Sequence, residues 1–457
     1  MSRKEYRAYS TLYTWGRAKN YRLGRRGTRD DSCQPEPIKV FDNCTIQQVA
    51  CGGGHTLVLL DNGSLYSFGY NQYGQLGNGT KVDSPLDASR DISNLSTKLT
   101  AVACGRYHSA ALDVNGAVFT WGGGKNGRLG HNDEQTRTIP CRVTRLPRAH
   151  KIFCGYHITA AITDDGLYTW GWGEHGQLGQ GSLEDSYGPR KVFFGSDNLV
   201  IAQLACGDRH CLVRAENGDV YTWGSNEYGQ LGIGQYNEIC SSPVLLTSLS
   251  GMMVTFVAAG DRHSAAVTNT GSLFTWGCGS EGQCGHGDYN DCDMPSLVES
   301  LVGVFIIKVF CGHNFTVALS KEHEIYCFGN SSYGQLGDGS KSSCCIPRKL
   351  LYSIPGPIDI TCGHFHCTLW TTVEEQDERN DIEIRARTES VDSCTTSCST
   401  GIPDEQQRKL EEKISSLNAK LMHMVSLNER VISESLLRLQ EELNKDGRET
   451  LEGILCD

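Results

Sequence analysis

One pattern of about 52 residues repeats seven times between residues 12 and 370, and it constrains the fold more than any other feature. Its first mark is an aromatic residue followed by Gly, with a second Gly nine positions after the aromatic: Trp15, Phe68, Trp121, Trp170, Trp223, Trp276 and Phe328. Its second mark, Cys-Gly-x-x-His in most copies, begins at Cys51, Cys104, Cys154, Cys206, Ala259, Cys311 and Cys362. A fixed period of this length indicates supersecondary units that bury their faces against their neighbours.

Within one unit the pattern is that of a β-hairpin. Thr56–Leu60 is a short apolar run, Asp61-Asn62-Gly63 is a tight turn, and Ser64–Phe68 alternates between polar and apolar residues. Asn-Gly suits the positive φ angles that hairpin turns require. A further strand, Ile46–Ala50, and a proline-led segment, Ile38–Phe41, precede the hairpin. One proline recurs per unit, which favours a strand start or edge because proline lacks an N–H: Pro35, Pro85, Pro140, Pro189, Pro243, Pro295 and Pro347.

Four short strands in each of seven units predict an all-β fold, a seven-bladed β-propeller. The chain begins with a lone hairpin strand, Leu12–Gly16, and the repeats end with Cys362–Trp370, which has no aromatic–Gly strand of its own. We therefore expect the N-terminal strand to complete the last blade and to close the ring. The predicted organisation is a propeller over residues 1–372, an acidic Ser/Thr-rich linker over 373–403, a helix over 404–446 and a tail over 447–457.

Charge is unevenly distributed along the chain. Residues 1–372 hold 31 Lys and Arg against 33 Asp and Glu, whereas residues 373–457 hold 11 against 20. A nearly neutral repeat region has no general attraction for nucleic acid. No apolar run is long enough to span a membrane, and residues 1–14 lack the apolar core of a signal peptide. We expect a cytoplasmic location, with the nucleus as the alternative, and 21 reduced cysteines that act as small buried residues.

A basic run in the first unit has two interpretations: a solvated loop edge, or a patch for an acidic partner. It consists of Arg17, Lys19, Arg22, Arg25, Arg26 and Arg29.

The repeated motifs Cys-Gly-x-x-His, Tyr-Thr-Trp-Gly and Gly-Gln-Leu-Gly resemble those of the regulator of chromosome condensation repeat family. The resemblance covers about four-fifths of the chain. It implies a seven-bladed propeller, but it leaves function open, because the family includes exchange factors, photoreceptors, ciliary scaffolds and ligase-associated adaptors.

Residues shared by the repeats are expected to be framework. Pairs such as Cys51 with His55 look like metal ligands, yet Ala259 replaces the cysteine in one unit and Phe315 the histidine in another. Each pair also stands alone in its blade, so we predict neither a metal site nor a bound cofactor. Three Gly-x-Gly-x-x-Gly segments precede turns rather than helices and are interpreted as turn glycines. No catalytic residues are predicted, and the chain is not expected to be an enzyme, apart from nucleotide-exchange activity.

Function is expected where the repeats differ, at the two residues between the Gly and the His of the second mark. The third unit is interpreted as one residue short, with Tyr156 alone at this place. Since these residues precede a strand in every blade, they should gather on one rim. The predicted partner-binding rim is Arg106, Tyr107, Tyr156, Asp208, Arg209, Asp261, Arg262, His313, Asn314 and His364.

The resemblance gives two contrasting readings of this rim. Exchange factors of the family use acidic residues at the places of Asp208 and Asp261, but they also insert a wedge for which the nine-residue interval leaves no room. The photoreceptor subgroup places Trp at these rim positions, and this sequence has none there. The leading prediction is a protein-interaction scaffold or adaptor; the alternative is an exchange factor or regulator of a small GTPase. Local ion pairs without any partner are a further interpretation of the two Asp-Arg pairs.

The C-terminal segment has an eleven-residue apolar period, which is typical of a nearly straight coiled coil. Its stripe is Leu410, Ile414, Leu417, Leu421, Val425, Asn428, Ile432, Leu436, Leu439 and Leu443. The single polar member, Asn428, resembles a buried amide that fixes register. We expect self-association through this helix; the alternative is a helix folded back on the propeller.

Overall fold

The computed structural model describes residues 6–376, apart from 28–29, 39–43, 87–91, 93–96, 196–198, 353 and 355–357. These residues belong to one compact unit, Met1–Asp377. The predicted coiled-coil stripe and the chain beyond Gln376 lie outside the described residues. Among the residues that are described, no helix is both long and apolar enough to cross a membrane.

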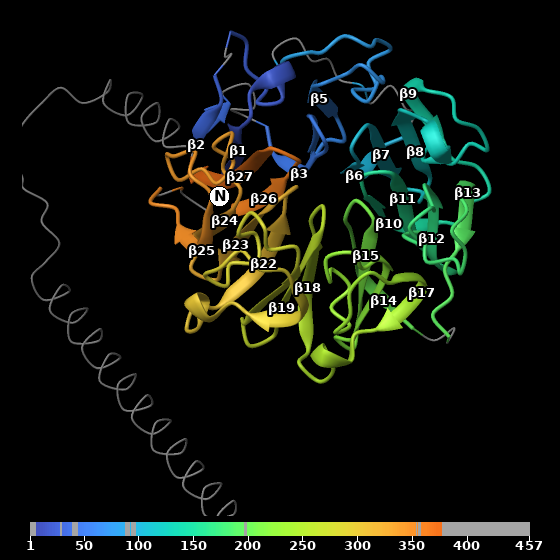
Figure 1. The fold of residues 1–457 in the computed structure, drawn as a ribbon. Coiled ribbons are helices and arrows are strands. Elements are labelled where there is room, and N and C mark those ends of the chain that lie inside the picture. The colour runs from blue at the N-terminus through green and yellow to red at the C-terminus, as the bar shows by residue number, and fades with distance from the viewer. Residues whose placement is uncertain are drawn as a thin grey trace, which may run out of the picture. The chain divides into compact units, whose positions relative to one another are not determined.

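Seven antiparallel sheets surround a central axis (Figure 1), which confirms the predicted seven-bladed propeller. Blade 1 consists of β3 (Ile46–Cys51), β4 (His55–Leu60) and β5 (Leu65–Gly69). Blade 2 consists of β6 (Leu99–Cys104), β7 (His108–Asp113), β8 (Val118–Gly122) and β9 (Arg137–Arg142). Blade 3 consists of β10 (Ala149–Cys154), β11 (Ile158–Thr163), β12 (Gly166–Gly171) and β13 (Ser186–Lys191). Blade 4 consists of β14 (Ile201–Cys206), β15 (His210–Ala215), β16 (Val220–Ser225) and β17 (Ile239–Leu245). Blade 5 consists of β18 (Val254–Ala259), β19 (His263–Thr268), β20 (Leu273–Gly277) and β21 (Cys292–Leu297). Blade 6 consists of β22 (Ile306–Cys311), β23 (Phe315–Ser320), β24 (Ile325–Gly329) and β25 (Cys344–Lys349). Single-turn 3-10 helices occur in the connecting loops: η1 (Lys19–Tyr21), η4 (Lys125–Gly127), η5 (Thr247–Leu249) and η6 (Glu299–Leu301).

Blade 7 joins the two ends of the repeat region. It consists of β26 (Ile358–Cys362), β27 (His366–Gln376), β1 (Tyr6–Gly16) and β2 (Ser32–Ile38), in that order from the axis outwards. β1 pairs with β27 in an unbroken register from Tyr6↔Gln376 to Gly16↔His366. The predicted composite blade is therefore confirmed, and β27 continues past the boundary predicted at residue 372.

The proline segments lie at sheet edges, as predicted, but they belong to the preceding blade rather than to the following one. Pro140, for example, lies in β9, which pairs with the preceding aromatic–Gly strand β8 and forms the outer edge of the blade. The proline segment thus closes the blade before it rather than opening the next one, which suits a residue without an N–H at a sheet edge. In blade 1 the described part of this segment contributes only a bridge between Gly69 and Ser84.

The hairpin turns also differ in detail from the prediction. Gly63 has a φ of +91°, but Asn62 does not have a positive φ. The N–H of Gly63 donates to Leu60 O, and the N–H of Leu60 donates to Ser64 O, both at 2.9 Å. This is a turn followed by one left-handed glycine, so only the glycine is conformationally required.

Aromatic side chains join neighbouring blades. The indole N–H of Trp121 in blade 2 donates to Gln75 O in blade 1 at 2.9 Å, and the ring is fully buried. A Cβ at Gly77 would lie only 2.7 Å from Trp121 Nε1, so this repeat glycine is needed for the close approach. The packing of an aromatic ring on the equivalent glycine recurs at every interface between blades and closes the ring, because Trp15 in blade 7 packs on Gly337 in blade 6.

Buried histidines form a second set of interblade contacts. In each, Nε2 lies 2.9 to 3.1 Å from a hydroxyl at the start of the second strand of the next blade: His55 with Ser109, His108 with Thr159, His210 with Ser264, His263 with Thr316 and His366 with Thr56. In Ser109 the hydroxyl proton is already donated to Gln75 O, so the imidazole must supply the other proton. Burial lowers the pKa of His55, His210 and His263 to about 3, which keeps these rings neutral.

The two blades without this histidine have matched partners. Ile158 replaces it in blade 3, and the facing position in blade 4 is Cys211; Phe315 replaces it in blade 6, and the facing position in blade 7 is Cys367. Each histidine therefore faces a hydroxyl, and each apolar replacement faces a thiol. A thiol is a weak hydrogen-bonding group and tolerates an apolar neighbour better than a buried hydroxyl does.

Candidate functional site

The loop between the first and second strands of each blade lies at one end of the propeller, and we call these seven loops the rim loops. They are residues 52–54, 105–107, 155–157, 207–209, 260–262, 312–314 and 363–365. In each loop the N–H of the second residue donates to a carbonyl of the next blade at 3.1 to 3.4 Å: Gly53 to Gly105, Arg106 to Tyr156, Tyr156 to Gly207, Asp208 to Asp261, Asp261 to His313, His313 to His364 and His364 to Gly52. The bonds return to their starting point, so the rim loops form a closed ring around the axis.

All ten side chains predicted for the rim lie in these loops. The second positions, whose N–H groups make these bonds, are Gly53, Arg106, Tyr156, Asp208, Asp261, His313 and His364. The third positions are Gly54, Tyr107, His157, Arg209, Arg262, Asn314 and Phe365.

The interpretation of the third unit as one residue short is wrong. Ile158 pairs with Gly171 just as His210 pairs with Gly224, so Ile158 occupies the framework position and His157 belongs to the rim. The spacing suggested a deletion because His157 lies one residue before the position at which most other units have their framework histidine. This blade therefore presents both Tyr156 and His157.

The two acidic residues of the rim are buried and already paired. Asp208 and Asp261 are 9% and 5% exposed. Asp208 lies 3.4 Å from Arg209 Nε and 3.6 Å from His157 Nε2, and Asp261 lies 3.4 Å from Arg262 Nε and 3.3 Å from His313 Nε2. Burial raises the pKa of both carboxyl groups, and the Asp261 charge adds to the effect on Asp208. The local ion pairs considered from the sequence are thus present.

Tyr156 covers the mouth of the axial channel. Although it comes from blade 3, its ring centroid lies 4.2 Å from that of His364 in blade 7 and 6.3 Å from that of His313 in blade 6. A cavity of about 120 Å³ lies below it, lined by the six cysteines that begin the second repeat mark and by Ala259. Burial raises the pKa of Cys51 to about 12, so this thiol is protonated and a poor metal ligand or nucleophile.

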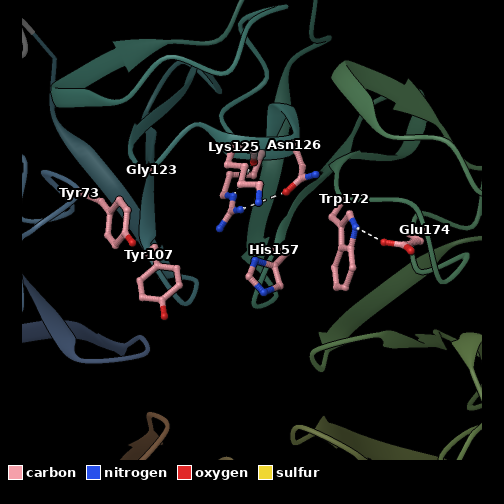
Figure 2. A pocket seen from close by; sticks show the side chains of 9 residues that line it. Tyr73, Tyr107, Gly123, Lys125, Asn126, His157, Trp172 and Glu174 are labelled. Carbon is pink, nitrogen blue, oxygen red and sulfur yellow. Dashed lines mark hydrogen bonds between the residues drawn. The ribbon is translucent and has the colours of Figure 1, made fainter.

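A groove with aromatic walls runs along the rim over blades 1 to 3. Figure 2 shows Tyr73 and Tyr107 on one side and Trp172 on the other, with Lys125 and His157 between them. The groove has a volume of about 430 Å³. The Tyr73 and Tyr107 rings lie 4.9 Å apart, and the His157 ring meets Trp172 edge-on at 5.2 Å. Arg128 lies beneath as a buried cation, held by its Nε donating to Lys125 O at 2.8 Å.

A model of the RCC1-like domain matches residues 11–371, the stretch that forms the propeller. The chain belongs to the RCC1-like domain family. This confirms the resemblance found in the repeats. Two relatives of this RCC1-like chain are the ultraviolet-B receptor UVR8 of Arabidopsis thaliana, 38% identical over 81% of this chain, and the human E3 ubiquitin-protein ligase HERC2, 33% identical over 79%. The aligned region spans 71% of UVR8 but only 6% of HERC2.

Solved structures share the RCC1-like fold at lower identity. Prp20p from Saccharomyces cerevisiae superposes with a TM-score of 0.71 at 21% identity, covering 84% of this chain and 95% of that one. Human WBSCR16 superposes with a TM-score of 0.69 at 24% identity, covering 79% and 98%.

The groove of this RCC1-like propeller contains residues that the sequence analysis did not select for the site. Tyr73, Lys125, Trp172 and Glu174 come from the loops after the aromatic–Gly strands, not from the rim loops. Trp172 directly follows an aromatic–Gly pair, at a position where blade 1 has Tyr70 and the other repeats have no aromatic residue. This difference between repeats is the signal in the sequence that could have identified it, because Trp172 lies beside a rim loop; its Nε1 donates to Glu174 at 3.2 Å.

The repeated Cys and His residues of the RCC1-like framework serve packing. The histidines contact hydroxyls of the next blade, whereas the cysteines line the axial cavity, so the two members of each pair point to different surroundings. Within the described residues, no cluster of three or more His, Cys, Asp or Glu is arranged to hold a metal ion.

Proposed function

We propose that this protein is a scaffold or adaptor that binds a protein partner through the rim of its propeller. The observation that supports this most strongly is the groove of about 430 Å³ between Tyr73 and Tyr107 on one wall and Trp172 on the other. Large aromatic side chains that are partly exposed around a recess, with Arg nearby, are typical of the residues that dominate binding energy at protein interfaces. We place the partner site here and on the adjoining rim positions.

The chemistry of the groove favours binding over catalysis. Burial and the nearby Arg128 lower the pKa of His157 to about 3. An imidazole with so low a pKa is a weak general base at neutral pH, since an effective base titrates near the working pH. The two rim carboxyls are engaged by their own loops' arginines. The polar groups therefore act as contacts for a partner.

Replacing either Trp172 or Tyr73 by alanine should weaken partner binding by about 2 kcal/mol, or about 30-fold. Each substitution removes one aromatic wall while leaving the blade framework intact. The partner would first be captured with the wild-type chain, and its dissociation constant would then be measured by titration against each variant.

Tyr236→Ala is the matched control, because Tyr236 is 42% exposed, as Tyr73 is, but does not line the groove. We expect the control to bind like the wild type. Equal affinities for wild type, Trp172→Ala and Tyr73→Ala would rule out the groove as the binding site.

A second candidate function is nucleotide exchange on a small GTPase. It is favoured by the adjacent carboxyls of Asp208 and Asp261 and by the likeness to Prp20p, whose structure was described together with its binding to Gsp1p and histones. Because both carboxylates are buried and paired, we expect the chain not to accelerate nucleotide release from a panel of small GTPases. Fast release that is lost in Asp208→Asn, with Asp219→Asn outside the rim loops as the control, would establish exchange and displace the scaffold proposal.

We also propose that the C-terminal stripe makes the scaffold multivalent. Two linked rims that engage one target would raise affinity by about 10²–10⁴ through effective concentration alone. A peptide of residues 404–446 should sediment as an oligomer, and Leu421→Asp should make it monomeric because a buried charge in the stripe is costly. A wild-type peptide that stays monomeric at high concentration would remove this part of the proposal. We place the protein in the cytoplasm, with the nucleus as the alternative.

A further inference from the structure

Two of the loops that follow the aromatic–Gly strands share a sequence that sets them apart from the equivalent loops of the other blades. Lys19-Asn20-Tyr21-Arg22 in blade 7 and Lys125-Asn126-Gly127-Arg128 in blade 2 both form a single helical turn with the Asn in a left-handed conformation, at φ of +64° and +61°. The arginine occupies the place of a glutamine in the other five blades: Gln75, Gln177, Gln230, Gln283 and Gln335.

Replacement of the glutamine by an arginine changes the hydrogen bonds that this position makes. Gln75 caps its own loop by accepting the N–H of Tyr73 at 3.0 Å, and Gln335 accepts that of Tyr333 at 2.9 Å. Arg22 instead donates from Nε to Lys19 O at 2.9 Å. Its guanidinium continues past the loop towards the rim, where it lines a pocket of about 210 Å³. A position that caps a loop in other blades is thus occupied in blade 7 by Arg22, a buried cation that lines the pocket.

This pocket is lined by positive charge. Arg17, Lys19, Arg22 and Arg106 contribute to its wall, together with Tyr70, Tyr107 and His364, and the lining contains no Asp or Glu. The rim loop below it has glycine at both variable positions, Gly53 and Gly54. A Cβ at Gly54 would lie 3.3 Å from Arg22 Nη2, so the missing side chain leaves room beside the guanidinium.

Two polar atoms of the pocket are buried and lack a partner. Arg22 is 6% exposed and His364 is 5% exposed, yet Arg22 Nη1 and His364 Nε2 make no hydrogen bond. A buried polar atom without a hydrogen-bond partner is costly, and native structures seldom contain one unless a ligand or a water molecule completes the bond. Both atoms belong to side chains of the same pocket wall.

The nearest acidic groups are already engaged. Asp31 accepts the N–H of Ala18 at 3.0 Å and pairs with Lys341 at 3.0 Å. Asp83 accepts the N–H of Asn71 at 2.8 Å and the amide of Asn20 at 2.6 Å. They offset part of the positive charge without filling the pocket.

We propose that this pocket binds a phosphate monoester carried by a serine, threonine or tyrosine of the protein partner. A phosphate monoester carries close to two negative charges and three acceptor oxygens, which matches several cations and the unpaired Arg22 donor better than a single carboxylate does. The pocket shares Tyr107 with the aromatic groove, so a chain lying in the groove can place a modified side chain in it. The identity of the carrier rests on the proposed function; the anion site itself does not.

The anion site can be tested without a partner. The full chain would be titrated with inorganic phosphate at constant ionic strength, and binding would be followed by ³¹P line width and by calorimetry. We expect one saturable site. Arg22→Gln installs the residue that five other blades already have, so the fold should persist, and it should weaken phosphate binding about tenfold or more. Lys19→Glu should do the same from an exposed position.

Lys321→Glu is the charge-matched control, because Lys321 is exposed in the hairpin turn after β23, at the end of the blade away from the rim loops. It should leave the phosphate affinity unchanged. The proposal is overturned if phosphate does not saturate, if Arg22→Gln binds as tightly as wild type, or if only Arg128→Gln in the related loop loses binding.

The carrier is tested with a phosphopeptide array beside matched unphosphorylated and Glu-substituted peptides. Preferential capture of phosphopeptides that Arg22→Gln abolishes supports a protein carrier. Tighter binding of a single-stranded oligonucleotide than of any phosphopeptide would contradict it. Neither result changes the groove test, which depends on Trp172 and Tyr73.

Discussion

A chain that lacks residues 1–16 should fail to form the cooperative propeller. β1 lies between β27 and β2, and its Leu12 and Trp15 side chains are fully buried in the interfaces with blades 1 and 6. Truncating one such side chain costs about 2–5 kcal/mol, so losing the whole strand removes as much as the usual net stability of about 5–15 kcal/mol. Chemical denaturation followed by tryptophan fluorescence measures the effect.

Deletion of residues 1–5 is the matched control and should leave the denaturation midpoint unchanged, because β1 begins at Tyr6. A synthetic peptide of residues 6–17 added to the truncated chain should restore the transition. If the chain without residues 1–16 unfolds at the wild-type midpoint, β1 does not close the ring in solution.

Acid should unfold the propeller between about pH 5.5 and 4.5. Burial lowers the pKa of five framework histidines, three of them to about 3, whereas an unfolded histidine titrates near 6.5. The folded state is therefore fully favoured above about pH 6.5 and loses stability as the pH falls towards 3. Each histidine contributes about 1.4 kcal/mol per pH unit, so five together lose about 7 kcal/mol per unit. Asp208 and Asp261, whose pKa is raised, act in the opposite sense but are fewer.

Urea midpoints measured from pH 7.5 to 4.5 test this expectation. His263→Gln keeps a donor for Thr316 but removes one titrating ring, so its stability should fall less steeply with pH, by about 1.4 kcal/mol per pH unit. His150→Gln is the control, because His150 is exposed and pairs with Asp164 at the surface. A urea midpoint that does not change between pH 7.5 and 4.5 would show that the histidines are not held neutral.

Much of the fold could be predicted because the number, length and strand pattern of the repeats indicate the number of blades and the strands in each. The period determined the number of blades, and the unpaired Leu12–Gly16 strand revealed the composite blade. The proline strands were assigned to the wrong blade because sequence order does not show which neighbouring strand a segment pairs with. Pro140 follows Trp121 by about as much as it precedes the next hairpin, and only the register with β8 decides.

The site was predicted in part. The ten rim positions followed from a simple rule, that residues before equivalent strands gather at one end. His157 was missed because a spacing cannot distinguish a deletion from a substitution when another histidine lies next to the expected one. Trp172 and Tyr73 were missed because the groove is made by loops of different blades, whose distance in space the repeat pattern does not contain.

The matched residues at the blade interfaces limit how the order of the repeats can change. If blade 4 followed blade 2 directly, His108 would meet Cys211, and if blade 5 followed blade 3, Ile158 would meet Ser264. Either junction would bury a polar group without its complement. Seven similar segments are therefore not interchangeable, and a duplicated or transposed segment would be tolerated only when both of its new borders preserve the same kind of pairing.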